Sequence, residues 1–443
     1  MDFEVIVAAP YWAMNGVHIF SANLVRGLLA RHIRAGILLT EQNSSLVNVK
    51  EPLMALPSDI PIDELPVSKP ESWGGHWRAM IRYLEDRAPC IYIPNYDWRH
   101  SCVSPMLSNR VCIVGIVHSD DPLHYDHVSR LGRYWNAIVG TSGAIAERVA
   151  LRHPALLERI TTIPIGVPAP ELFPERRRDE NTPLRIVYHG VLTQYQKRIL
   201  DLPRIVTALL ERRIPVILTV VGDGSGRERL LEESRHLVEC GAMRFLGVLP
   251  HSEILEILEQ QDVYILTSEF EGMPNALNEA MAYGCVPVVT DIRSGIPQVV
   301  RDEVNGYRVP VGEIHAFADR LALLQRDPER RRAMALQAYR TVIEGGYRSE
   351  DMVQSYVELF RRVLREANLG AYKRPRGELQ PPPQEVAGIQ ILPGSYSRDI
   401  EDTELSLLWK GRLPTSVLAA RWLGKRGLRR LHDILKRRLM DKP

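Results

Sequence analysis

The pattern that most constrains the fold is an alternation of apolar, β-branched runs with amphipathic stretches of helical periodicity. The runs lie at 3–9, 35–40, 90–94, 110–118 and 135–142 in the first half, and at 184–190, 216–222, 243–247, 262–268 and 285–290 in the second. Runs that are apolar on both faces and separated by helices are typical of buried parallel strands. The sequence therefore predicts an α/β protein with two Rossmann-like domains, each a doubly wound parallel sheet of about five strands.

Stretches rich in proline and charge mark the expected boundaries. We expect an N-terminal domain at 1–167, a linker at 168–183, a C-terminal domain at 184–346, a helix at 347–370 that packs back toward the N-terminal domain, and a Pro-rich linker and tail at 371–443. The Pro-rich stretch 52–70 is expected to be a surface loop inside the first domain.

Composition narrows the class of protein. With 45% hydrophobic and 25% charged residues, the chain has a globular rather than a disordered composition. Its five cysteines contain no CxxC pair, which disfavours a disulfide framework and the common zinc spacings and suits a reducing compartment. The N-terminal run follows two acids and no basic residue, so we expect a strand and not a signal peptide. The apolar stretch 111–117 is far shorter than the roughly 20 residues of a membrane span. We expect a cytosolic protein, at most attached to a membrane surface, that binds no nucleic acid.

Open α/β sheets bind ligands beyond the carboxyl ends of their strands, so the turns after the strands are informative. The turn SEFEGMPNALNEAMAYG (268–284) has a proline suited to a first helical turn, which predicts a helix from about Met273. The start of this helix would form an anion site, with Met273, Pro274, Asn275, Ala276 and Leu277 as its residues. Glu271 and Glu279 flank that site, where carboxylates suit sugar or ribose hydroxyls. From spacing alone, ordinary helix charges explain them equally well.

This segment resembles glycosyltransferase family 4. Glu271 and Glu279 match the E-x7-E motif of retaining GT-B glycosyltransferases, and the resemblance extends from the N-terminal strand to about residue 367, being clearest over 184–312. It implies a GT-B fold, with an acceptor-side first domain and a donor domain that binds a nucleotide-diphosphate sugar. In the family the first Glu contacts the donor sugar, and the second holds the nucleotide ribose.

A basic pair follows the first strand of the second domain, in HGVLTQYQKRILDL (189–202). On its own such a pair is usually solvated, but the resemblance places Lys197 on the donor phosphates. The family often has an Arg directly after Gly190, where this chain has Val191. Two interpretations stay open: Arg198 substitutes for the missing cation, or the site carries one cation fewer.

Three glycines are candidates for close backbone approach to a ligand. VVGDGSGRERL (220–230) has GxGxG spacing rather than GxGxxG, and no acid lies about 20 residues later, so a tight turn explains it better than a dinucleotide site. The resemblance gives Gly222 and Gly190 supporting roles beside the donor. Gly16, in the turn after the first strand, permits close approach of a phosphate or acceptor, although an ordinary turn glycine is the alternative.

The segment HSDDPLHYDH (118–127) invites a metal interpretation, because it resembles the HxHxDH run of metallo-hydrolases. However, Pro122 replaces the first ligand and no later His cluster completes a second set. We therefore expect no metal, and solvated loop positions for most of these groups. His118 ends an apolar strand and resembles the family's cleft histidine near the reacting sugar. A buried core histidine is the alternative.

The expected function is that of a retaining glycosyltransferase that moves a sugar from a nucleotide-diphosphate sugar to a hydroxyl acceptor, such as a glycan or a lipid-linked saccharide in polysaccharide biosynthesis. Glu271 and His118 are the candidate catalytic residues, and a front-face mechanism needs neither metal nor cofactor. A nucleotide-sugar epimerase, a non-catalytic nucleotide-sugar-binding subunit and, more remotely, a metal hydrolase are alternatives. The sequence does not indicate the base, the sugar, the linkage or the oligomeric state.

The C-terminal tail is strongly basic. Residues 409–443 hold 11 Lys or Arg and 2 Asp, a net charge of +9 in a chain of net charge +2, so the rest is mildly acidic. Leu428, Leu431, Leu435 and Leu439 fall at helical spacing among basic residues. Two interpretations are equally supported: peripheral attachment to an anionic membrane, or docking of this helix on the acidic body.

Overall fold

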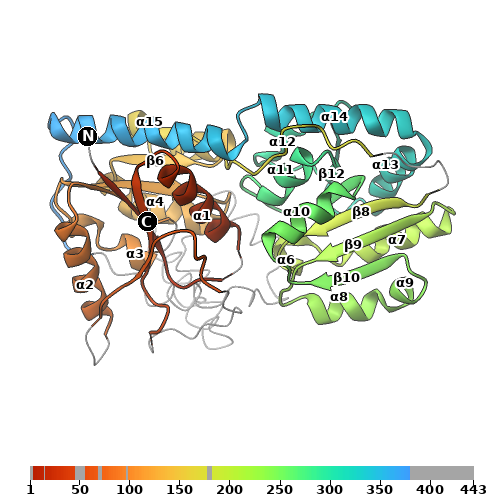
Figure 1. Ribbon diagram of the computed structural model, residues 1–443, viewed down its shortest axis with the longest axis horizontal. Coiled ribbons are helices and arrows are strands. Elements are labelled where there is room, and N and C mark those ends of the chain that lie inside the picture. Colours follow the sequence, from red (N-terminus) through yellow and green to blue (C-terminus); the bar gives the residue numbers. More distant parts are fainter. Residues whose placement is uncertain are drawn as a thin grey trace, which may run out of the picture. The chain divides into compact units, whose positions relative to one another are not determined.

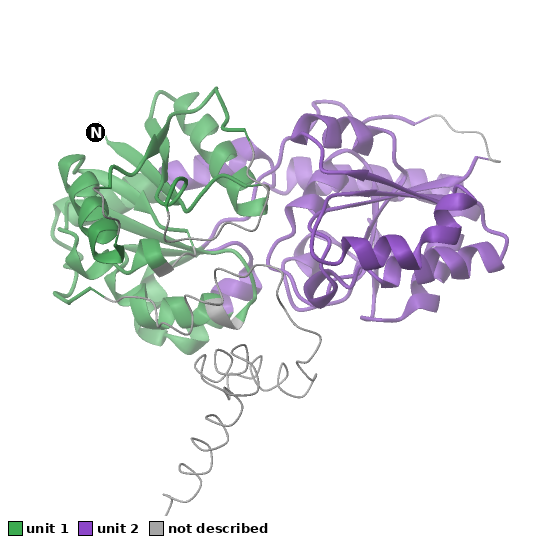
Figure 2. Ribbon diagram, turned by 90° about the horizontal axis from the view of Figure 1, so that it is seen from below, with its two compact units in different colours: residues 1–139, 148–161, 359–443 green, residues 140–147, 162–358 purple. Residues whose placement is uncertain are grey.

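The computed structural model describes residues 3–13, 15–44, 55–67, 72–95, 98–176 and 182–379. The chain divides into two compact units (Figure 2). Unit 1 comprises residues 1–139, 148–161 and 359–443, and unit 2 comprises residues 140–147 and 162–358. The predicted basic tail lies outside the described residues. No helix in the part of the chain described is long and apolar enough to cross a membrane.

The first sheet has seven strands in the order β3-β2-β1-β4-β5-β6-β7. They are β1 (Glu4–Ala9), β2 (Arg34–Leu39), β3 (Ile62–Glu64), β4 (Cys90–Ile93), β5 (Val111–Val117), β6 (Ala137–Gly140) and β7 (Ile160–Thr162). The pairings among β1 to β5 are parallel. The connecting helices are α1 (Gly16–Leu29), α2 (Trp73–Asp86), α3 (Trp98–Ser101), α4 (Pro122–Leu131) and α5 (Gly143–Arg152). Strands β4 and β5 are buried along their whole length, as their unbroken apolar sequences predict.

The second sheet has six strands, all paired in parallel, in the order β10-β9-β8-β11-β12-β13. Figure 1 shows β8, β9 and β10 side by side in this order. They are β8 (Leu184–His189), β9 (Val216–Val221), β10 (Met243–Gly247), β11 (Val263–Leu266), β12 (Val286–Thr290) and β13 (Tyr307–Val309). The helices are α6 (Gln194–Lys197), α7 (Asp201–Glu211), α8 (Arg227–Glu233), α9 (Arg235–Glu239), α10 (His251–Glu259), α11 (Asn275–Ala282), α12 (Ile296–Val299), α13 (Ile314–Arg326) and α14 (Pro328–Glu344). Two parallel-sheet, Rossmann-like domains confirm the predicted fold class.

Helix α15 (Ser349–Asn368), the last in the described part of the chain, begins in unit 2 and ends in unit 1. Beyond it, the buried side chain of Arg374 fastens the chain to unit 1. Its guanidinium donates to the backbone carbonyls of Leu107, Ser108, Val111 and Tyr134 at 2.6–2.9 Å. These bonds compensate the burial of the charge and hold the segment after α15 in place.

The structure corrects three sequence-based expectations. The sheets have seven and six strands rather than about five each, because β3, β7 and β13 are three residues long, too short to show a pattern. Strand β3 lies inside the stretch 52–70 that was expected to be a loop. Helix α11 begins at Asn275, two residues after the predicted start, because Pro274 keeps an extended backbone and acts as the N-cap.

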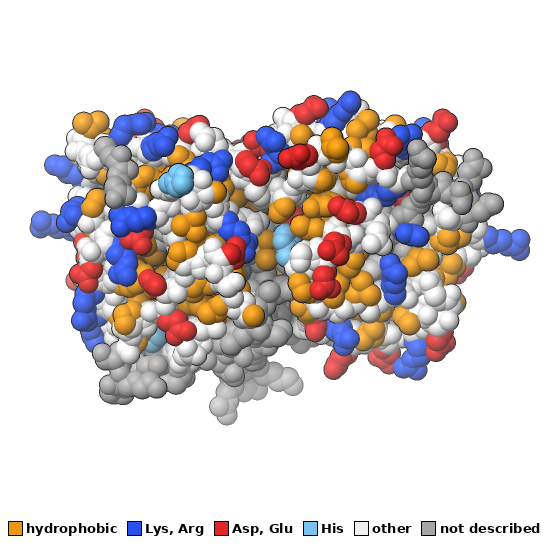
Figure 3. Space-filling view, in the orientation of Figure 1, with side chains coloured by type: hydrophobic (Ala, Val, Ile, Leu, Met, Phe, Trp, Pro, Cys, Tyr) orange, Lys and Arg blue, Asp and Glu red, His pale blue; other side chains and the backbone are white. Residues whose placement is uncertain are grey.

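Charged side chains of both signs are mixed on the face of the molecule drawn in Figure 3, among apolar and neutral ones. Many of the described charged residues form exposed ion pairs, such as Arg212 with Asp319 and Arg332 with Glu175. Pairs of this kind contribute little to stability, so the polar interactions that matter most here are the buried ones.

Candidate active site

The carboxyl edge of the unit 2 sheet gathers most of the predicted donor-site residues. Because all six strands run in parallel, the loops after β8, β9 and β11 meet at one edge. These loops and the start of α11 carry Gly190, Lys197, Arg198, Gly222, Glu271, the residues 273–277 and Glu279. The structure thus brings together residues that lie up to 89 positions apart in the sequence, from Gly190 to Glu279.

Lys197 and Glu271 form the central ion pair of this edge. The Lys197 Nζ lies 2.6 Å from the Glu271 Oε1, and the two side chains are 17% and 6% exposed. The Ser268 hydroxyl donates to the same carboxylate oxygen at 2.6 Å. Lys197 is the last residue of α6, and the Thr267 hydroxyl fixes it by donating to its carbonyl at 2.8 Å. This lysine is therefore paired and largely covered rather than solvated.

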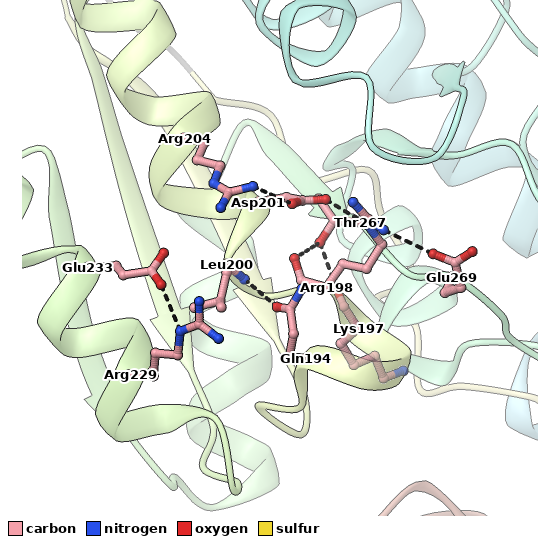
Figure 4. A network of polar contacts seen from close by, with 10 residues as sticks. All are labelled: Gln194, Lys197, Arg198, Leu200, Asp201, Arg204, Arg229, Glu233, Thr267 and Glu269. Carbon is pink, nitrogen blue, oxygen red and sulfur yellow. Dashed lines mark hydrogen bonds and ion pairs between the residues drawn. The ribbon is translucent and has the colours of Figure 1, made fainter. Parts of the chain in front are cut away.

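Arg198 lies apart from the carboxylate that Lys197 contacts. Its backbone is left-handed, with a φ of 47°. Its guanidinium donates to Asp201 at 2.8 Å and to Glu269 at 3.2 Å. In Figure 4 the Lys197 and Arg198 side chains point in different directions from adjacent positions. Arg198 joins the start of α7 to the loop after β11, and in this arrangement its charge is already matched by two carboxylates.

Glu279 lies between two histidines that sequence reasoning missed. The His251 Nε2 is 2.7 Å from the Glu279 Oε1, and the His189 Nε2 is 3.9 Å from the Oε2. Burial raises the pKa of the Glu279 carboxyl, but the hydrogen bond and charge of His251, together with His189, outweigh it and hold that pKa below its ordinary value. Glu279 is therefore an ionised, buried carboxylate. The sequence could have indicated His189, because this residue follows an apolar run at the end of a strand, as His118 does. Nothing in the sequence around His251 indicates a role for it.

The start of α11 supports only part of the predicted anion site. Pro274 has no N–H, and the Leu277 amide already donates to the Pro274 carbonyl at 3.1 Å. Two of the five residues predicted for the anion site, Pro274 and Leu277, therefore have no backbone N–H available for an anion. Met273 is buried in the preceding turn and lies against Gly295, where a Cβ would come 2.5 Å from the Met273 methyl carbon.

Gly222 and Gly190 allow two loops to cross in direct contact. A Cβ on Gly222 would lie 2.0 Å from the Gly190 carbonyl oxygen, and both glycines have positive φ, 130° and 147°. Side chains cannot occupy that space or that backbone conformation. Close packing of the loops after β8 and β9 thus explains the glycine-rich turn, as the tight-turn interpretation expected.

The predicted residues of unit 1 lie at the carboxyl edge of the first sheet. His118 follows β5 directly, is 8% exposed, and has its Nε2 3.1 Å from the Asn95 Oδ1. Its ring packs edge-on against Phe20, and burial lowers its pKa to about 3, so the imidazole is neutral. Gly16 is the first residue of α1, after the N-cap Asn15.

The segment 118–127 is not the solvated loop that was expected. Residues from Pro122 onward form α4, and Asp120, Tyr125 and His127 are buried. Asp120 pairs with Arg148 at 3.0 Å and accepts a hydrogen bond from the Tyr125 hydroxyl. Within the described ranges, no three His, Cys, Asp or Glu side chains are grouped as metal ligands would be. The sequence prediction failed because charged residues with internal partners have the same composition as a polar loop.

Comparison with known proteins relates this geometry to a family. Residues 171–341 match the model of the glycosyl transferases group 1 family. The chain is 32% identical over 186 residues to N-acetyl-alpha-D-glucosaminyl L-malate synthase of Bacillus anthracis. This match covers 42% of this chain and 48% of the relative. It is also 32% identical over 173 residues to the putative colanic acid biosynthesis glycosyltransferase WcaL of Escherichia coli. That match covers 37% of this chain and 42% of the relative. The chain thus spans about half the length, or less, of these relatives.

Among solved structures, Anabaena Alr3699/HepE in complex with UDP is similar over 82% of this chain and 100% of its own, with a TM-score of 0.63 and 15% identity. At this identity the likeness establishes the fold alone. Residues 171–341, which make up most of unit 2, match the glycosyl transferases group 1 family, and the two Rossmann-like sheets have the GT-B fold.

Proposed function

We propose that the protein is a retaining glycosyltransferase that transfers a sugar from a nucleotide-diphosphate sugar to a hydroxyl acceptor. The observation that carries the proposal is the partly buried Lys197–Glu271 pair, which lies at the same sheet edge as the ionised Glu279 inside the region that matches the family. A cation and two carboxylates at the carboxyl edge of a parallel sheet suit a ligand with both phosphate charge and hydroxyl donors.

Lys197 would bind the diphosphate. Its ammonium now contacts one carboxylate and has three N–H donors, so phosphate oxygens can replace or share that contact. Glu271 would then accept hydrogen bonds from hydroxyls of the donor sugar, with the Ser268 hydroxyl keeping it in place. Glu279 would accept the hydroxyls of the ribose. Amides at the start of α11 would add to the positive potential at the phosphates.

The transfer step would follow a front-face course. The acceptor hydroxyl attacks the anomeric carbon on the face that the nucleoside diphosphate leaves, and the leaving phosphate takes the proton of that hydroxyl. The protein then contributes positioning and charge stabilisation rather than a nucleophile. His118, neutral because of its burial, would contribute a hydrogen bond and not a positive charge.

The acceptor would be a glycan or a lipid-linked saccharide. The WcaL relative is named for colanic acid biosynthesis, and HepE binds UDP, which favours a nucleotide-sugar donor and a saccharide acceptor. The basic sequence of residues 409–443 fits peripheral attachment to an anionic membrane, where lipid-linked acceptors lie.

An assay of turnover by NMR tests the proposal. Purified protein is incubated with UDP-, GDP- and ADP-sugars and a panel of saccharide acceptors, with and without EDTA. The expected result is release of nucleoside diphosphate, a product with the anomeric configuration of the donor, and activity that survives EDTA.

The control is Glu271→Gln, which should lose turnover and still bind free nucleotide. An inverted product would contradict the front-face mechanism, and complete EDTA sensitivity restored by a divalent ion would contradict the metal-free site. Isomerised donor without transfer would identify an epimerase. Binding without turnover of any donor would identify a non-catalytic subunit.

A further inference from the structure

Glu279 is held by residues from two other elements of unit 2. His189 ends β8, His251 begins α10, and Glu279 lies on α11. The Glu279 and His189 side chains are each 6% exposed, whereas the His251 side chain is 26% exposed. A carboxylate this deeply buried needs a partner to remain ionised.

The two histidines have different partners, although both approach the same carboxylate. The His189 Nε2 lies 3.2 Å from the Ala276 carbonyl oxygen, which can only accept, so this nitrogen carries a hydrogen and donates it there. Its 3.9 Å separation from the Glu279 Oε2 is too long for a hydrogen bond. Burial is the largest effect on His189 and lowers the pKa of its imidazole below the ordinary value.

His251 makes the direct contact. Since an ionised carboxylate only accepts, the His251 Nε2 carries the hydrogen and donates to the Glu279 Oε1 at 2.7 Å. A carboxylate has about four acceptor positions, and this bond takes one of them. The remaining positions are those that a vicinal diol would use. A protonated carboxyl group, in contrast, would itself be a donor and could not accept two hydroxyls equally well.

We propose that His251 is a positioning residue for nucleotide recognition: its hydrogen bond to Glu279 fixes the orientation in which the carboxylate accepts the ribose hydroxyls. The inference rests on the proposed role of Glu279 as the ribose ligand. It gives His251 a defined effect on one part of the ligand, the 2′-hydroxyl edge of the ribose, and none on the phosphates, which Lys197 would bind.

The test measures discrimination between ribose and deoxyribose. UDP, GDP and ADP are titrated calorimetrically into the full chain, and the tightest of them is compared with its 2′-deoxy counterpart. The parent should prefer the ribonucleotide by about tenfold, the scale of one hydrogen bond to a charged group. Glu279→Ala should remove the preference.

His251→Ala should reduce the preference to less than about threefold, whereas His251→Gln should retain most of it, because the glutamine amide can donate the same hydrogen bond. The matched control is His236→Ala, at an exposed position of α9, which should leave the preference unchanged. Rescue by glutamine separates positioning of Glu279 from a general loss of structure.

Two results would overturn the inference while leaving the proposed function intact: an unchanged ribose preference in His251→Ala, or tighter binding in that variant, which would mean that His251 competes with the ribose. If the parent binds none of the three nucleoside diphosphates, the proposed function fails and the inference fails with it. A parent that binds them without any ribose preference rejects the assignment of Glu279 and therefore that of His251.

Discussion

Replacing Lys197 with methionine should destabilise unit 2 and impair nucleotide binding. The substitution keeps the aliphatic length and removes the charge. Breaking a fully buried ion pair costs about 3–5 kcal/mol, whereas an exposed pair contributes about 0–1 kcal/mol. Lys197 is 17% exposed, and Glu271 keeps the Ser268 hydroxyl as a donor at 2.6 Å, so the cost should lie between these limits, at about 2 kcal/mol. In a unit of this size, that lowers the midpoint of thermal unfolding by about 4–8 °C.

A double-mutant cycle isolates the pair. Urea unfolding of Lys197→Met, Glu271→Gln and the double variant should give a coupling free energy of about 1–2 kcal/mol, because the second substitution removes the carboxylate that the first leaves unpaired. Binding separates structure from function. Lys197→Met should weaken nucleoside diphosphate binding at least about tenfold, whereas Glu271→Gln should leave it nearly normal. Additive stabilities would refute the ion pair, and unaltered nucleotide binding by Lys197→Met would refute the phosphate role.

Three further predictions concern other parts of the chain. Gly222→Ala should cost more than about 3 kcal/mol in unfolding free energy, whereas Gly241→Ala, which also has positive φ but no atom within 4 Å of the new Cβ, should cost only about 1–2 kcal/mol; equal costs would show that the contact with Gly190 does not matter. His18 and His118 have pKa values lowered by burial to about 4 and about 3, so from pH 6.5 down to 4 the unfolded chain binds protons that the folded chain does not, and stability is lost by up to about 1.4 kcal/mol per pH unit for each histidine. Thermal unfolding at several pH values should show that His118→Gln reduces the slope of unfolding free energy against pH, because one of the two buried histidines is gone. The control His32→Asn, at an exposed position, should keep the parent's slope. Identical slopes in the parent and both variants would contradict the burial of a neutral His118. Deleting residues 409–443 should abolish sedimentation with anionic vesicles without altering nucleotide binding, and equal sedimentation with and without the tail would reject membrane attachment.

The long strands could be predicted because buried parallel strands need unbroken apolar sequence. The run at 110–118 became β5 with each end shortened by one residue, and the runs at 184–190 and 216–222 became β8 and β9, each ending one residue earlier. Strands β3, β7 and β13 were missed, since three residues at the edge of a sheet carry too little pattern, and pairing with a neighbouring strand decides their structure.

The candidate site could be predicted only in part. Glu271 and Glu279 are close in sequence and flank the start of one helix, whereas Lys197 was indicated only by the resemblance to glycosyltransferase family 4, because its contact with Glu271 spans 74 positions. The contact between His251 and Glu279 joins residues 28 positions apart on different helices, and nothing in the residues around His251 indicates it. Likewise, Arg198 lies next to Lys197 in the sequence but contacts Asp201 and Glu269, because its left-handed backbone turns the side chain away.

A crystal structure of the protein with a bound nucleoside diphosphate tests the central claim most directly. The account predicts phosphate oxygens within hydrogen-bond distance of the Lys197 Nζ, ribose hydroxyls on the Glu279 carboxylate, and a Lys197–Glu271 separation longer than the 2.6 Å of the free protein. A nucleotide bound away from the carboxyl edge of the unit 2 sheet, or one that leaves both Lys197 and Glu279 without contact, would contradict it.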